Sequence, residues 1–242
     1  MYQPRTYRHW VKTSDLVNFS VIVEETDCYF SASSNLQGKA RRLILKYRAS
    51  LKKYIASQPA FLTTLEPIAI LPGAPRIVQA MARAGEKAGV GPMAAVAGAI
   101  AHFVGEELSH FSPELIIENG GDIFLCGRRP RLIGIYAGNS PLSGKVGFEI
   151  NPGGRAIGIS TSSGTVGHSL SFGKADAVVV VAENAVLSDA VATGLANRVF
   201  TPEDIQPCLE RAQKIEGVTG CVAIKGEHAG FWGEIRLRNI DV

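Results

Sequence analysis

The sequence predicts an α+β fold in which mixed, mainly antiparallel sheets pack against helices. Short strand-like segments follow one another with turn residues between them, and amphipathic helical segments interrupt the series without a strict strand–helix alternation. The chain has 242 residues, of which 46% are hydrophobic, so it can bury a sizeable core. We expect a single domain over residues 1–242, and the sequence leaves open a division into two lobes, about 1–90 and 91–242.

The first part of the chain predicts strands and then helices. Residues 7–32 alternate polar and apolar side chains, which is typical of two or three antiparallel strands. Gly38 precedes a long amphipathic helix, the proline-containing residues 58–74 predict a loop, and a second helix over about 75–87 ends at Gly89. The long helix places five apolar residues on one face: Leu43, Ile44, Tyr47, Leu51 and Ile55.

The second part of the chain is dominated by strands. A short strand or turn opens residues 91–111, and a helix of small residues follows. Further strands are expected over 114–127 (two strands joined by a Gly-Gly turn), 132–138, 145–150, 156–163 and 176–182. The last of these is apolar throughout, as expected of a strand buried on both faces. Helices over 185–199 and 202–215 and a strand pair over 221–226 and 230–238 complete the chain.

Composition excludes several classes of protein. The net charge is only +3, and the Lys/Arg residues from Lys39 to Lys53 are spaced as a solvated helix face, so we expect no nucleic-acid partner. The N-terminus has no apolar signal region and no window of about 20 apolar residues exists, so we expect no membrane partner. The four cysteines form no C-x-x-C pair and are expected to be reduced, in a cytoplasmic protein.

The segment from Thr161 to Gly194 holds the strongest indication of a site. A Ser/Thr/Gly-rich loop with His168 and Lys174 leads into an apolar strand and then a helix, and a polar loop on a rigid scaffold is a usual site arrangement. Hydroxyls, glycine N–H groups and an ammonium suit phosphate oxygens. The imidazole could transfer a proton near neutral pH. A solvated surface loop is the alternative that the residues alone leave open.

Two smaller groups of residues carry weaker signals. Asp189 and Thr193 lie four positions apart, on one helix face, with the hard oxygen ligands that Mg²⁺ accepts. Periodicity alone favours structural roles, in which Asp189 interacts with the helix dipole and Thr193 bonds back to a carbonyl. A Gly-Gly pair separates Asn119 from Asp122, and glycines allow close approach of a ligand. Taken alone, that pattern favours a plain hairpin turn.

Familiar nucleotide and hydrolase motifs are absent. Residues Gly138–Lys145 imitate a P-loop, but five residues separate the glycines where the motif needs four, and Val146 replaces the Mg²⁺-binding hydroxyl residue. No G-x-G-x-x-G follows an expected strand, and no G-x-S-x-G occurs in the sequence. The sequence therefore supports neither a P-loop, a Rossmann site nor a serine-hydrolase site.

Four segments, in one order, resemble the ApbE-like superfamily. They are GAIAHF (98–103), ENGGDI (118–123), TSSGT (161–165) followed by a histidine, and SDAVATG (188–194). The best-known members are FAD:protein FMN transferases, which attach FMN to a threonine or serine of a partner protein, with FAD as donor and Mg²⁺ as cofactor. The resemblance is clear over about residues 90–200 and implies an ApbE-like (T-fold-like) fold. The whole chain looks most like a shorter, uncharacterised "UPF"-type branch.

The resemblance assigns roles to individual positions. It implies Mg²⁺ ligands at Asp189 and Thr193, with a backbone carbonyl near Ala99–Ala101, and a proton-transfer role for His168. Asp122 would orient the ligand, and Lys174 is a candidate for a replacement phosphate contact. The residues implied to lie against the flavin nucleotide or to line its pocket are Asn119, Gly120, Gly121, Thr161, Ser162, Ser163 and Gly164.

The chain also departs from the transferase pattern. His102 stands where the transferases have a lysine, and SLSFGK replaces the D-P-x-T-G segment. The resemblance thus implies binding of FAD or a related nucleotide with Mg²⁺ and leaves open whether flavin or nucleotidyl transfer is retained. The alternatives are a non-catalytic binding or assembly protein and a transferase acting on a small molecule. The helix over 95–104 fits either the core or a subunit interface, and a homodimer is expected from base rates.

Overall fold

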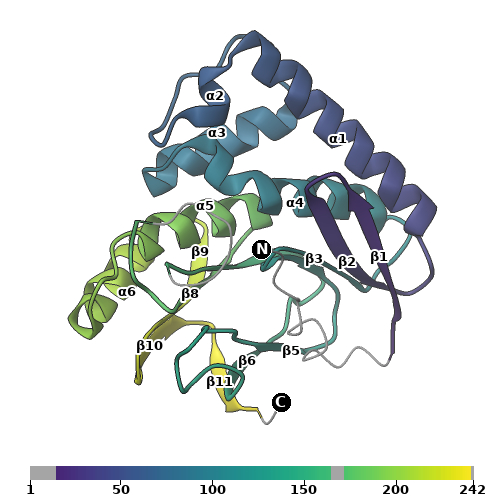
Figure 1. Ribbon diagram of the computed structural model, residues 1–242. Helices are drawn as coiled ribbons and strands as arrows, with labels where there is room; N and C mark the ends of the chain where they lie inside the picture. The colour runs from purple at the N-terminus through teal and green to yellow at the C-terminus, as the bar shows by residue number, and fades with distance from the viewer. Residues whose placement is uncertain (1–14, 165–171, 241–242) are drawn as a thin grey trace.

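The computed structural model describes residues 15–164 and 172–240. They form helices and two antiparallel sheets, which confirms the expected α+β class. Eight strands make the larger sheet in the order β1-β2-β3-β4-β7-β8-β9-β10, and three make the smaller in the order β11-β6-β5. Figure 1 shows the helices as a layer above the larger sheet, with the smaller sheet below. His168 and the first part of the expected strands over 7–32 lie outside the described residues.

The strands of the larger sheet are β1 (Val17–Val23), β2 (Thr26–Ala32), β3 (Leu115–Asn119), β4 (Asp122–Cys126), β7 (Ala156–Ser162), β8 (Ala177–Ala182), β9 (Val218–Lys225) and β10 (His228–Gly233). The smaller sheet consists of β5 (Arg131–Gly134), β6 (Val146–Ile150) and β11 (Arg236–Asn239). The helices are α1 (Gln37–Ser57), α2 (Ala60–Thr63), α3 (Arg76–Ala88), α4 (Val96–Ser109), α5 (Ala185–Ala196) and α6 (Ile205–Gln213). Two 3₁₀ turns, Pro92–Ala95 and Pro202–Asp204, precede α4 and α6.

Strand β8 contributes to apolar clusters on both faces of the larger sheet. Val178 and Val180 point to the helical side and pack in the cluster formed with α5 and α6. Val179 and Val181 point the other way and pack against the smaller sheet. A strand that is buried on both faces does not alternate apolar with polar residues, which explains why the sequence of β8 is apolar throughout.

Helix α4 is built from small residues because it packs closely on three sides. A Cβ at Gly98 would lie 2.1 Å from the carbonyl oxygen of Ala185, and one at Gly105 would lie 2.4 Å from the Phe124 ring. Both distances are far below van der Waals contact, so these positions require glycine. The small-residue helix expected from the sequence therefore belongs to the core of the fold, between α5 and the sheet.

The structure differs from the sequence expectation most in three segments, and β5 also ends at Gly134 where a strand was expected up to residue 138. The expected strand over 230–238 is divided at Gly233, whose φ of 96° turns the chain out of the larger sheet, so that β11 joins the smaller one. The expected loop over 58–74 contains the short helix α2. The expected strand or turn before α4 is a 3₁₀ turn that begins at Pro92, whose fixed φ suits a first helical position.

Among the described residues, no single helix is long and apolar enough to cross a membrane. Helix α3 and the stretch Pro92–Ser109 pass that test together by length and composition, but they are bent by 107° relative to one another.

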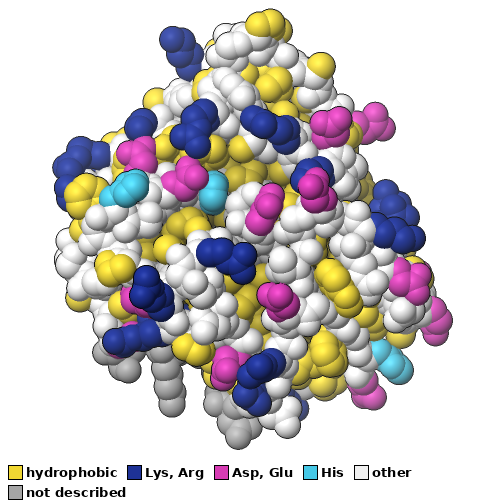
Figure 2. All heavy atoms as spheres, turned by 180° about the vertical axis from the view of Figure 1, so that it is seen from behind, with side chains coloured by type: hydrophobic (Ala, Val, Ile, Leu, Met, Phe, Trp, Pro, Cys, Tyr) yellow, Lys and Arg dark blue, Asp and Glu magenta, His cyan; other side chains and the backbone are white. Residues whose placement is uncertain are grey.

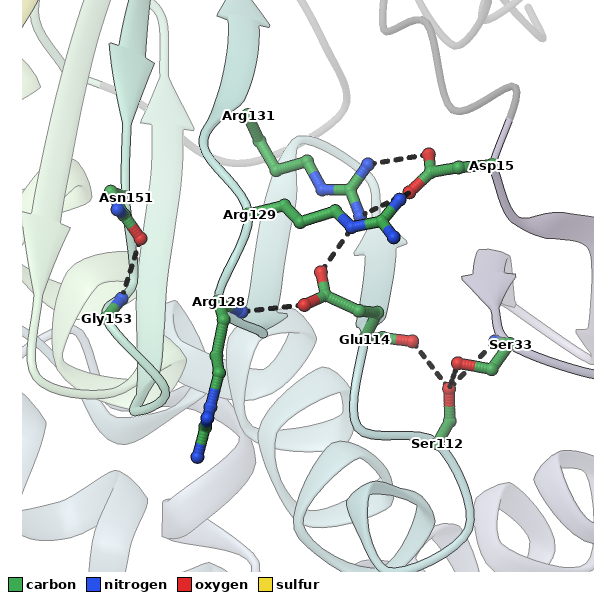
Figure 3. A network of polar contacts seen from close by, with 9 residues as sticks. All are labelled: Asp15, Ser33, Ser112, Glu114, Arg128, Arg129, Arg131, Asn151 and Gly153. Carbon is green, nitrogen blue, oxygen red and sulfur yellow. Dashed lines mark hydrogen bonds and ion pairs between the residues drawn. The ribbon is translucent and has the colours of Figure 1, made fainter.

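A network of charged and polar groups joins the two sheets at the end opposite the β3–β4 turn (Figure 3). Arg131 of β5 donates to Asp15 Oδ1 at 2.8 Å and to Glu114 Oε2 at 2.9 Å. The backbone N–H of Arg128 donates to Glu114 Oε1 at 2.7 Å. Burial would raise the pKa of Glu114, but the N–H of Arg128 and the Arg131 guanidinium lower it overall. The Arg131 side chain is only 6% exposed, so these contacts form with little competing water.

Replacing Arg131 tests whether this network stabilises the fold. Arg131→Ala is expected to lower the free energy of unfolding by about 3 kcal/mol, because it leaves two partly buried carboxylates without their cation. Arg129→Ala, which removes an exposed partner of the same Asp15, should cost less than about 1 kcal/mol. Urea unfolding of the three proteins measures both values, and equal effects would contradict the assignment.

The same network predicts a pH dependence. The folded-state pKa values of Asp15 and Glu114 are lowered, mainly by Arg131 for Asp15. The contribution of these two carboxylates to the free energy of unfolding is therefore fully present above their pKa in the unfolded state, about 4. It is lost as the pH falls through their pKa values in the folded state. The difference in unfolding free energy between wild type and Arg131→Ala should narrow when the pH is lowered from about 6 to 3. A constant difference over this range would show that the carboxylates are not the source of the effect.

Candidate functional site

The site is built around the turn between β3 and β4. Asn119 and Asp122 are paired across this turn, and Gly120 and Gly121 have φ values of 71° and 103°. Positive φ at both central residues is what a two-residue hairpin of this kind requires. The tight turn expected for the residues taken alone is therefore present. The Asn119 and Asp122 side chains are nevertheless buried, so the turn also delivers two polar groups into the interior.

These groups meet the first turn of α4 and the middle of α5. The Asn119 amide donates to the carbonyl oxygen of Ala97 at 3.0 Å. The Asp189 carboxyl accepts a hydrogen bond of 2.8 Å from the backbone N–H of Gly98. The N-terminal N–H groups of a helix have no partner within the helix, and a carboxylate there is favoured by the helix dipole. Asp189 thus lies in the interior of α5 and interacts with the N-terminus of α4.

Asp122 and Asp189, which we call the carboxyl pair, lie within hydrogen-bonding reach of one another. Burial, followed by the charge of Asp122, raises the pKa of Asp189 well above its usual range, and the N–H groups of Gly98 and Ala97 oppose this shift only in part. Two buried carboxyls in contact are unfavourable when both are ionised without a cation. The pair therefore needs either a shared proton or a bound cation.

The oxygen atoms around the carboxyl pair fit a hard divalent cation. Carboxylate, carbonyl and hydroxyl oxygens are the ligands of Mg²⁺, which also keeps water or phosphate oxygens in its shell. Within the described ranges, no group of three or more His, Cys, Asp or Glu side chains could hold a metal. A cation here would have to complete its shell with backbone oxygens, hydroxyls, or groups of a bound ligand. A zinc or iron site of the usual His/Cys type does not fit these residues.

Several contributors to this region were not anticipated from the sequence. Ser160 lies opposite Asp122 in the sheet, and its hydroxyl is 2.7 Å from that of Ser188, which precedes Asp189. Both serines are fully buried. Glu118 is also buried and accepts the N–H of Gly121 at 2.8 Å, which braces the Gly-Gly turn. The only available signal was proximity in sequence to expected site residues, since pairing across the sheet determines these contacts.

The segment Thr161–Gly164 extends β7 past the carboxyl pair. The N–H of Thr161 donates to the carbonyl oxygen of Gly121 at 3.2 Å, which brings these two expected segments together. Ser162 lies opposite Val178 of β8. The Ser163 hydroxyl and the Gly164 N–H both donate to the carbonyl oxygen of Ala175. These contacts hold Ser163 and Gly164 against the segment that precedes β8.

Lys174 and Thr193 are less closely tied to the carboxyl pair. The backbone N–H of Lys174 donates to the carbonyl oxygen of Val199 at 2.7 Å, and its side chain is exposed. Thr193 is half-buried, one helical turn beyond Asp189. No described hydrogen bond joins either side chain to the pair, and none joins the Thr193 hydroxyl to a carbonyl of the preceding turn. The roles expected for these two residues, and for His168, stay predictions.

His102 lies one turn after Gly98 on α4. Its ring packs against Phe124 and its Nε2 atom is 3.5 Å from Glu106. Burial lowers the pKa of His102, an effect that Glu106 opposes, so the imidazole is uncharged at neutral pH. The Nδ1 atom is buried and has no hydrogen-bond partner. The position therefore presents a neutral ring close to strand β4.

A cleft elsewhere in the protein contains none of the expected site residues. It has a volume of about 690 Å³ and lies between the two sheets, where Ala156 begins β7 and Ala182 ends β8. Strands β7 and β8 are antiparallel, so these residues mark the end of the sheet opposite Thr161. Asn119, Asp122 and Thr161, which the sequence analysis gives as site residues, thus lie together at one end of the larger sheet.

Comparisons with known proteins identify the family of the chain. The family described as "AbpE bacteria" matches residues 8–228. The chain belongs to the AbpE bacteria family. Relatives of the chain include a "UPF0280 protein" of Methanococcus aeolicus, 48% identical over 201 residues, with 81% of each chain covered. Another UPF0280 protein, from Methanococcus vannielii, is 42% identical over 227 residues, and the match covers 91% of this chain and 92% of the relative.

Solved structures show the fold of this AbpE bacteria family member. The flavin transferase ApbE from Vibrio cholerae matches with a TM-score of 0.62 at 13% identity, covering 92% of this chain and 97% of that one. The flavinyl transferase ApbE from Pseudomonas stutzeri, in its apo form, matches with a TM-score of 0.61 at 12% identity, covering 92% and 94%. The expected ApbE-like fold and the place in a UPF0280 branch are confirmed. At such low identity the likeness concerns the fold alone.

The contact between α4 and α5 can be tested at Gly98. A Cβ there would lie 2.7 Å from the Asp189 Cβ as well as against the Ala185 carbonyl oxygen, so Gly98→Ala must separate the two helices. We expect a loss of about 1–3 kcal/mol in unfolding free energy. Gly38→Ala is the matched control, because its Cβ would meet only the end of the Arg42 side chain at 3.9 Å. It should leave stability unchanged or raise it by up to about 1 kcal/mol. Thermal unfolding distinguishes the two outcomes.

Proposed function

We propose that this protein binds a flavin or related nucleotide together with Mg²⁺ at the carboxyl pair. The observation that carries the proposal is the contact between two buried carboxyls, Asp122 and Asp189, at the N-terminus of α4. Such an arrangement is costly without a cation. Neighbours in fold that are named as flavin transferases support the nucleotide class. Neighbouring segments with many hydroxyls and glycines support binding of phosphate oxygens.

The proposal gives each group a definite task. Asp189, with Thr193 and a backbone carbonyl of the Ala99–Ala101 segment, would hold Mg²⁺, which when bound neutralises the charge of a pyrophosphate. Asp122 would orient the ligand. Through its contact with Asp189 it would also keep the second oxygen of the Asp189 carboxyl in place. Asn119, through its bond to the Ala97 carbonyl oxygen, fixes the first turn of α4 against the turn of the sheet. The segments Gly120–Gly121 and Thr161–Gly164 would line the pocket, with Lys174 as a further phosphate contact.

Catalysis would require a proton-transfer group as well as a bound nucleotide. His168 is our candidate, since it follows in sequence the Thr161–Gly164 segment, whose first residue bonds to Gly121, the neighbour of Asp122. With FAD as the donor, breaking the pyrophosphate bond would transfer the FMN group to an acceptor and release AMP. The acceptor would be a hydroxyl of a protein or a small molecule.

One observation favours a second function, binding without transfer. The transferases have a lysine where this chain has His102, and burial keeps the His102 ring neutral at physiological pH. A cation available in the transferases is thus absent at this position. A protein that retained the scaffold and the carboxyl pair but lost the transfer step would bind the nucleotide and release no AMP.

Calorimetric titration tests the metal-dependent binding. Wild type is expected to bind FAD or FMN more tightly in the presence of Mg²⁺, and Asp189→Asn should weaken that binding at least about tenfold, a change of 1.4 kcal/mol. The asparagine keeps an oxygen that can accept the Gly98 N–H, so the fold should survive. Glu210→Gln, on the exposed side of α6, is the matched control. Equal Mg²⁺-dependent affinities in all three proteins would refute the proposed metal site.

Chromatography of the nucleotide products separates the candidate functions. AMP release from FAD with labelling of an acceptor protein indicates transfer to protein, and AMP release without labelled protein indicates transfer to a small molecule. Mg²⁺-dependent binding without AMP release indicates the non-catalytic function. Absence of binding to any flavin nucleotide would contradict the nucleotide class, whatever the behaviour of the metal site.

A further inference from the structure

Two of the four cysteines meet where α6 packs on β9. Cys208 of α6 is 4% exposed and Cys221 of β9 is 0% exposed, and both belong to one apolar cluster. Their thiols lie within hydrogen-bonding reach of one another, and both are free. We call Cys208 and Cys221 the thiol pair. Two thiols in contact have the proximity that a disulfide requires.

The packing of α6 on the sheet explains why these two side chains meet. A Cβ at Gly230 of β10 would lie 2.6 Å from Cγ2 of Ile205, so α6 approaches the sheet closely at this glycine. Gly230 lies opposite Ala223 of β9, and Cys221 is two positions before Ala223, on the same face of the strand. Cys208 is three positions after Ile205, on the same buried side of α6. The thiol of Cys208 is therefore held over β9.

The two thiols have unequal environments. The Cys221 thiol donates to Cys208 and, together with the charge of Arg211, lowers the pKa of Cys208, although burial acts in the opposite direction. The same contact and burial raise the pKa of Cys221 well above its usual range. Because the thiolate is the attacking form in thiol–disulfide exchange, Cys208 suits the attacking role and Cys221 the resolving role.

We propose that the thiol pair is a reversible oxidation site, at which Cys208 and Cys221 form a disulfide in exchange with a small soluble disulfide of the oxidised-glutathione class. The disulfide would join α6 covalently to β9. The thiol pair is separated from the carboxyl pair by two strands of the larger sheet, β7 and β8. The inference therefore does not rest on the proposed function, and each can fail without the other.

The exchange takes place in two steps. The thiolate of Cys208 attacks one sulfur atom of the small disulfide, whose S–S bond breaks, and the departing thiolate takes up a proton. The Cys221 thiol then loses its proton and attacks the Cys208 sulfur, which forms the internal S–S bond and releases the second small thiol. The two protein thiols are oxidised and the small disulfide is reduced to two thiols, so that electrons and protons balance.

Access to the thiol pair requires local opening of α6, because both thiols are buried. Helix α6 is short, and its outer side presents exposed polar residues, Gln206, Glu210 and Gln213. Strand β10, against which it also packs, is an edge strand of the larger sheet. Figure 1 places α6 at one side of the molecule, and Figure 2 shows charged side chains of both signs on that side. A short peripheral helix opens at lower cost than the core elements.

The other two cysteines serve as internal controls. Cys28 of β2 and Cys126 of β4 lie on strands separated by β3, opposite its two ends, Asn119 and Leu115. That separation is too large for a disulfide. Burial also raises the pKa of Cys126, which disfavours its thiolate.

Peptide mapping after oxidation tests the inference. The full chain is incubated with oxidised glutathione, the remaining thiols are blocked with iodoacetamide in denaturant, and the protein is digested. The peptides of Cys208 and Cys221 are expected to be joined, while Cys28 and Cys126 carry the blocking group. Dithiothreitol should restore both thiols. Because the disulfide closes a loop between α6 and β9, it should raise the Tm by about 5–10 °C.

Single variants separate the two roles. Cys221→Ala should retain glutathione on Cys208, because the resolving thiol is gone, whereas Cys208→Ala should retain none on Cys221. Cys126→Ser is the matched control and should form the same cross-link as wild type. Circular dichroism confirms that each variant is folded. An oxidised wild type whose thiols all remain free, as expected of two cysteines that only fill the core, overturns the inference. So do a cross-link to Cys28, to Cys126 or between two copies of the chain, and equal glutathione adducts in the two alanine variants.

Discussion

The hydrogen bond from the Gly98 N–H to the Asp189 carboxyl is the contact on which the functional end of the molecule depends. It forms only because Gly98 lets α4 approach α5 until a Cβ would meet the Ala185 carbonyl oxygen. That approach places the first turn of α4 over the β3–β4 turn, where Asn119 can reach the Ala97 carbonyl oxygen. Three elements distant in sequence are thus fixed around one carboxyl group by a single glycine.

The same contact explains why a buried carboxyl is tolerated. Isolated in a core, Asp189 would be strongly unfavourable as an anion. The N–H groups of Gly98 and Ala97 offset part of that cost, and the nearby Asp122 carboxyl adds to it. An arrangement meant only for stability would place an apolar residue at one of the two positions. Two carboxyls at these positions create an electrostatic strain that a cation or a shared proton relieves, as is common at sites of function.

The sequence was sufficient to predict elements whose pattern reflects local burial. The apolar run of β8 and the apolar face of α1 are predictable because each residue's environment repeats with the period of its element. The strand over 230–238 was not resolved into β10 and β11, because its division depends on the positive φ of Gly233. Side-chain periodicity does not reveal backbone dihedrals. The assignment of β11 to a different sheet follows from that single turn.

The site was predictable only in part, for a related reason. Asp122 and Asp189 were singled out by their neighbours in sequence and by a family resemblance, and the structure brings the two together. The contact between Ser160 and Ser188 was invisible, because it depends on which strand pairs with β4 and on which face of α5 meets the sheet. Polar groups that meet through tertiary packing leave no periodic signal in either segment. The carboxyl pair itself could not be foreseen, since the residues lie in different elements.

The position of His102 bears on how a nucleotide's charge could be balanced in this branch of the fold. A lysine there would bring a permanent positive charge close to the phosphate region, whereas the buried imidazole of His102 is neutral and packs on Phe124. Neutralising a bound pyrophosphate in this chain would then fall to a cation at the carboxyl pair and to Lys174. Dependence on the metal should consequently be stronger here than in a protein with the lysine. The neutral ring also leaves one buried nitrogen without a hydrogen-bond partner, a cost that a well-packed apolar residue would avoid.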